Sequence, residues 1–68
     1  MKVGDKVRFI GRETEKYHPD FAQLLGEVGV IVNVLGNVDG CYVVFEGFVD
    51  AVGDVEFLCW NEELEVID

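Results

Sequence analysis

Apolar and polar residues alternate in several short stretches of this chain, with the two-residue period of half-buried β-strands. The first stretch, residues 6–9, places Val7 and Phe9 on one face. The longest, residues 27–34, places its four valines on one face. Because a slip of one residue would exchange the two faces, this regular pattern predicts a firmly set strand register.

Residues 11–26 lose the alternation and predict a long first loop. Within it, a short helical turn is expected at residues 20–25, with Asp20 as its cap and Gly26 as its end. The turn-forming residues 36–40 then separate the strand at 27–34 from another at 41–45. These two strands are predicted to form a hairpin.

A fourth strand is predicted at residues 55–60, after a looser connection at residues 47–53. If the connection is centred near Asp50, the inward positions of the two strands coincide and give three cross-strand pairs: Phe45 with Val55, Val43 with Phe57, and Cys41 with Cys59. Residues 61–63 are too few for more than a 3₁₀ turn. A short fifth strand is expected at residues 64–67.

Five short strands, a long first loop and a 3₁₀ turn before the last strand predict an all-β fold, a small five-stranded SH3-like barrel. Closure of such a barrel removes exposed sheet edges. At 68 residues the chain is expected to be a single domain covering residues 1–68. Its core is thin, because a chain of this size buries only about 60% of the surface that it exposes when unfolded.

Four segments, each a strand with a turn, resemble the small SH3-like barrel proteins of unknown function in bacteria and phages: residues 4–9, 26–32, 42–46 and 64–67. The likeness covers nearly the whole chain and implies a fold more than an activity. Residues 26–32 also resemble the core of the KOW motif of RNA-binding and ribosome-associated proteins. They keep Gly26 and Gly29 but carry Glu27 and no base, where the motif is usually rich in Lys and Arg.

The charge is divided unevenly along the chain, which has a formal net charge of -9 at pH 7. All five basic residues lie in the first sixteen positions, and eleven acidic residues without a base follow them. Such a surface repels phosphates and favours basic partners, although it also serves solubility. In an SH3-like barrel the chain ends lie close together, so we expect the terminal acids to neutralise part of the basic segment.

No catalytic, cofactor or metal signature is found in the sequence, and we expect a non-enzymatic protein without a cofactor. The chain has no serine, and its single histidine, His18, precedes Pro19 in the long loop without an evident nucleophile beside it. The acidic run at residues 62–65 lacks the pattern of a calcium loop. Cys41 and Cys59 do not have the spacing of a metal half-site and are expected to be reduced core residues.

Aromatic side chains in loops beside carboxylates could anchor a basic peptide. The residues that meet this description are the predicted partner contacts: Tyr17, Phe21, Phe48, Trp60, Glu62 and Glu63. The competing interpretation is that the loop aromatics fold inward and close the ends of the barrel. The favoured function is a non-enzymatic, acidic interaction module that binds the basic surface of a protein partner.

The alternative function is a KOW-like nucleic-acid or ribosome-associated module that uses the basic segment, namely Lys2, Lys6, Arg8, Arg12 and Lys16. The charge balance does not favour nucleic acid as the partner. No apolar stretch approaches the roughly 18 residues that a membrane-spanning helix needs, and the first residues lack the apolar segment of a signal peptide. These features predict a cytoplasmic location without membrane contact.

Overall fold

The computed structural model describes residues 1–11, 19–50 and 52–67. Its elements follow in the order β1 (Lys6–Phe9), α1 (Pro19–Ala22), β2 (Val28–Val34), β3 (Gly40–Phe45), β4 (Glu56–Trp60), η1 (Asn61–Glu63) and β5 (Leu64–Val66). The predicted all-β class, its five strands and the 3₁₀ turn before the last strand are confirmed. The helical turn predicted in the first loop is α1, which begins at Pro19 instead of Asp20, since the fixed φ of proline suits the first position of a helix.

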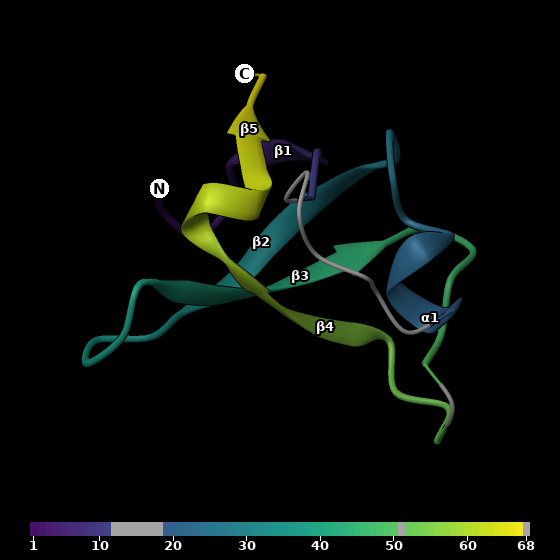
Figure 1. Cartoon of the computed structure of the whole chain (residues 1–68). Helices are drawn as coiled ribbons and strands as arrows, with labels where there is room; N and C mark the ends of the chain where they lie inside the picture. Colours follow the sequence, from purple (N-terminus) through teal and green to yellow (C-terminus); the bar gives the residue numbers. More distant parts are fainter. Residues whose placement is uncertain (12–18, 51, 68) are drawn as a thin grey trace.

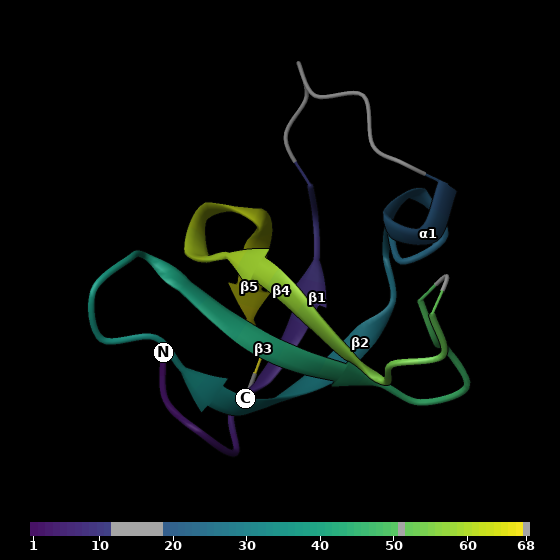
Figure 2. The ribbon, with the colours of Figure 1, turned by 90° about the horizontal axis from the view of Figure 1, so that it is seen from below.

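The five strands form one antiparallel sheet in the order β4-β3-β2-β1-β5. Strand β2 is shared by the two halves of the sheet, because it pairs with β1 through its first residues and with β3 along most of its length. Figure 1 shows β5, and Figure 2 shows β1, running across the direction of β3 and β4. Strands β4 and β5 are the two edges of the sheet, and the turn η1 connects them (Figure 2).

The core lies inside the curl of this sheet. Its buried hydrophobic side chains form one cluster: Val7, Phe9, Leu24, Ile31, Cys41, Val43, Phe45, Phe57, Cys59 and Leu64. The ring of Phe45 meets Phe9 and Phe57 edge to face, with centroids 6.3 and 6.0 Å apart. Aromatic pairs of this geometry contribute about 0.5–1.5 kcal/mol beyond the area that they bury. These contacts therefore tie β1, β3 and β4 together across the thin core.

The register predicted between β3 and β4 is confirmed by two pairs, Val43 with Phe57 and Cys41 with Cys59. All four side chains are buried, as inward positions should be. The third predicted pair, at Phe45, falls just beyond the end of this ladder.

Strand β2 carries apolar residues on both of its faces. Ile31 is buried, whereas the valines at positions 28, 30 and 32 point outward and are between 39% and 43% exposed. Val34 is likewise 39% exposed, so the four valines of the predicted face have the same exposure. A β-bulge between Ile31 and Asn33 shifts the register and pairs Val34 with Cys41, whose side chain points inward.

Gly29 lies where β2 passes close to β3, and we predict that Gly29→Ala destabilises the fold by about 1–3 kcal/mol. An added Cβ would come within 2.7 Å of Val43 Cγ1 and of the Val44 carbonyl oxygen, and within 2.9 Å of Phe45 Cδ1. Urea unfolding followed by circular dichroism measures the effect. Gly36→Ala is the control, because its added Cβ meets nothing within 4 Å. Equal midpoints for the two variants would contradict the prediction.

Candidate functional site

The predicted contact residues do not gather on one surface. Phe21 and Phe48 are partly buried and pack against the core. Trp60 is exposed and follows the buried Cys59 on β4, so its side chain lies on the opposite, outer face of the sheet. Tyr17 lies outside the described residues. The interpretation in which loop aromatics turn inward therefore fits Phe21 and Phe48.

The segment around α1 covers one end of the core. The ring of Phe21 lies 5.6 Å from that of Phe57 in an edge-to-face contact and 6.3 Å from that of Phe9. Leu24 is fully buried beside them. The Gly26 N–H donates a 2.8 Å hydrogen bond to the Phe9 carbonyl oxygen and so fixes the end of the segment to β1. Phe21 thus closes this end of the hydrophobic core.

The acidic turn η1 is bound to the sheet through Glu63, which is only 4% exposed. Its Oε1 accepts a 2.8 Å hydrogen bond from the Trp60 N–H, as the glutamate of a capping box does. Its carbonyl oxygen accepts the N–H groups of Ile10 and Gly11, at 2.8 and 3.2 Å. Glu63 is therefore a structural residue where a surface contact was expected, and Glu62 is the exposed carboxylate of the pair.

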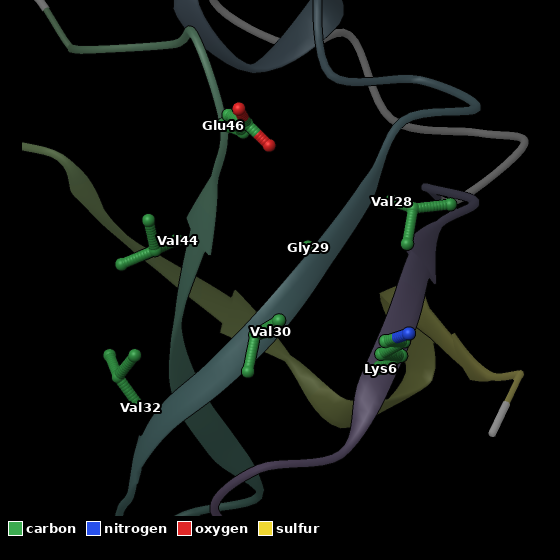
Figure 3. A pocket seen from close by; sticks show the side chains of 7 residues that line it. All are labelled: Lys6, Val28, Gly29, Val30, Val32, Val44 and Glu46. Carbon is green, nitrogen blue, oxygen red and sulfur yellow. The ribbon is translucent and has the colours of Figure 1, made fainter.

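A groove of about 450 Å3 lies on the outer face of the sheet (Figure 3). We call it the valine groove after its lining residues, which are Lys6, Val28, Gly29, Val30, Val32, Val44 and Glu46. The labelled valine side chains project from β2 and β3, and Lys6 and Glu46 lie at the rim. None of these residues except Lys6, as part of the basic segment, was predicted as a contact. The available signal was that the strand carries Ile31 on one face and valines on the other, whereas a strand buried on one side needs apolar residues on one face alone.

The strand register sets the order of groups across the groove. Val30 of β2 lies opposite Lys6 of β1 and opposite Val44 of β3. Val44 in turn lies opposite Glu56 of β4. Because cross-strand partners share a face of the sheet, two valines stand between a basic and an acidic residue.

The outer face stays apolar beyond the groove, toward the far end of β4. Leu58 lies opposite Tyr42, and Trp60 lies opposite Gly40. Leu58 is 41% and Trp60 42% exposed. The exposed tryptophan thus belongs to the same face of the sheet as the valines.

The basic segment is partly neutralised, as the sequence predicts. Arg8 Nη1 lies 3.3 Å from Glu65 Oε1, and both side chains are about half exposed. An exposed pair of this kind contributes about 0–1 kcal/mol, but it compensates the charge that a phosphate would need. Arg12 and Lys16 lie outside the described residues.

Cys41 and Cys59 are free thiols that face each other in the core. Burial raises the pKa of the Cys59 thiol to about 12, and the negative charge of Glu63 adds to the rise. Burial also raises the pKa of Cys41. Within the described ranges, no group of three or more His, Cys, Asp or Glu side chains is placed to hold a metal ion. The thiols are therefore packing groups in their protonated form.

Fold and surface together define a small all-β protein with an acidic charge balance and an exposed apolar face. Its structure is similar to the solution structure of the cyanobacterial cytochrome b6f complex subunit PetP, with a TM-score of 0.73 and 28% sequence identity. The similarity covers 100% of this chain and 81% of that chain. No family model matches the sequence, and no curated protein matches it.

This similarity overturns the predicted cytoplasmic location, because PetP is a subunit of the cyanobacterial cytochrome b6f complex. In the part of the chain that the structure describes, no helix combines the length and the hydrophobicity needed to cross a membrane.

We predict that both thiols resist alkylation in the native protein. A pKa raised from 9.0 to about 12 lowers the thiolate fraction of Cys59 about a thousandfold at pH 8, and the thiolate is the reactive form. Mass spectrometry after iodoacetamide treatment at pH 8 should show little native labelling and complete labelling in urea. The cysteine-free variant, C41A with C59A, controls for labelling of other groups. Rapid labelling of the native protein would contradict the buried, protonated state.

Proposed function

We propose that this protein is a non-enzymatic binding subunit that docks on a larger, membrane-embedded protein assembly of the cytochrome b6f type. The observation that carries the proposal is the full-length structural similarity to PetP at 28% identity. Fold similarity alone would not transfer a function. Here the similarity spans every element of the sheet, and the surface has independent features that suit binding.

The surface supports a binding role through two properties. Its outer face exposes apolar side chains on adjacent strands, which is typical of protein interaction sites. Its charge balance is strongly acidic, which favours a partner with a basic surface and speeds their encounter. A catalytic role finds no support in the residue set, since the chain has no serine and its described thiols are buried and protonated.

The proposal keeps part of the contact set expected from the sequence. Trp60 is exposed on the outer face, and Glu62 is exposed on the turn that follows it. Both are proposed as contacts, with Trp60 as an aromatic anchor and Glu62 as a rim charge. Phe21, Phe48 and Glu63 support these surfaces from within the fold.

The test is affinity capture of cytochrome from detergent-solubilised cyanobacterial thylakoid membranes, with the tagged protein on a resin. We expect haem absorbance on the resin at about 50 mM salt, well above that on a resin carrying the tag alone. Raising the salt to about 500 mM should weaken retention, because the contact is partly electrostatic. Glu62→Lys should lower the affinity about twofold to fivefold, as expected for a rim charge.

The proposal fails if the folded wild-type protein retains no haem above the tag control. A gel-shift titration with RNA and DNA at low salt tests the alternative nucleic-acid function. Salt-sensitive binding to nucleic acid, without capture of cytochrome, would replace a protein-binding role by a KOW-like one.

A further inference from the structure

The outer face of the sheet exposes more apolar side chains than is usual for a sheet face that only contacts water. Its valines at positions 28, 30 and 32 and its large side chains Leu58 and Trp60 are each about two-fifths exposed. In an antiparallel sheet with one face in water, the outward positions are usually polar. A contiguous exposed apolar face of this kind marks a surface that another molecule covers.

The composition of the valine groove indicates what kind of group it accepts. At about 450 Å3 it has the size of a small-molecule pocket. Such pockets, however, hold their ligand with several precisely placed polar groups, and here the charged side chains of the lining are confined to Lys6 and Glu46 at the rim. The valine floor instead suits the apolar side chains of a polypeptide.

The charges around the groove restrict the partner further. Glu46 lies at the rim, and Glu56 lies opposite Val44 on the same face of the sheet. Lys6 is the basic residue of the lining. With a net charge of -9, the chain repels anionic lipid headgroups and also a second copy of itself. A complementary occupant therefore carries Lys or Arg beside its apolar side chains.

We infer that the valine groove docks a segment of a membrane protein in which apolar residues are flanked by Lys and Arg, at the boundary between membrane and water. This inference rests on the proposed function and names the surface and the partner chemistry for it. Membrane proteins concentrate Lys and Arg in the loops beside the cytoplasmic ends of their membrane-spanning helices. Such segments combine the two properties that the groove selects. The valines supply contact area, and the carboxylates of Glu46 and Glu56 orient the basic ends.

The test uses synthetic peptides that cover the Lys- and Arg-rich, membrane-flanking segments of the cytochrome b6f subunits. Each is titrated into the 15N-labelled full chain, and chemical-shift changes are followed by NMR. We expect at least one peptide to shift the amides of residues 28–32 and of Val44. The same peptide with its basic residues replaced by Gln should bind about tenfold more weakly.

Two variants place a charge on the outer face and one places it elsewhere. Val30→Glu and Leu58→Glu, on different strands, should each weaken the peptide about tenfold or more, which corresponds to losing the burial of one aliphatic side chain. Val52→Glu is the matched control, because Val52 is 88% exposed in the connection between β3 and β4. It should bind like the wild type. Thermal unfolding shows which variants are folded, so a loss of binding counts only for a folded protein.

The outcomes separate this inference from the proposed function. If cytochrome is captured but the outer-face variants bind as well as Val52→Glu, the groove is not the docking surface and the proposed function stands. If a peptide binds in the groove but no cytochrome is captured, the proposed partner assembly is wrong. The inference that the groove binds an apolar segment flanked by Lys and Arg then still holds. If no peptide binds, or if phosphatidylglycerol vesicles bind instead, the inferred partner is wrong. Concentration-dependent dimerisation that Val30→Glu abolishes would assign the groove to a second copy.

Discussion

The double pairing of β2 is the constraint on which the rest of the structure depends. This strand holds β1 on one side and β3 on the other, so it joins the two halves of the sheet while Ile31 on its inner face stays buried. Gly29 allows the close approach to β3, and the bulge after Ile31 shifts the register between the two strands. Placing Ile31 inward in turn leaves the neighbouring valines outside, so the bulge and the apolar outer face arise from the same strand.

The register of β3 and β4 could be predicted from the sequence. A connection centred near Asp50 makes the inward positions of the two strands coincide, and these positions carry Val43, Phe57 and the two cysteines. In β2 the same reasoning is ambiguous, because valines alternate with a glycine and an isoleucine, and hydrophobicity alone does not select the inner set. The bulge has no clear signature in the sequence, and it places Val34 opposite the buried Cys41.

The candidate site was predicted less well, for a related reason. Aromatic and acidic residues near loops attract attention as contacts, yet a thin core recruits the same residues for closure. Phe21 fills the end of the core, and Glu63 caps the turn beneath Trp60. The type of side chain could not distinguish a surface contact from a structural residue. The difference depends on whether the residue packs against the inner face of the sheet or lies on its outer face. Trp60 stays outside only because its neighbour Cys59 points inward.

The combination of an apolar outer face with a charge of -9 has a consequence for the protein before it meets a partner. An exposed face of valines would by itself promote aggregation between copies. A net charge far from zero keeps copies dispersed, because each repels the next over distances longer than the reach of an apolar contact. The acidity thus protects the protein from self-association while its apolar face is exposed. It also favours contact with a basic partner over contact with a second copy of the chain.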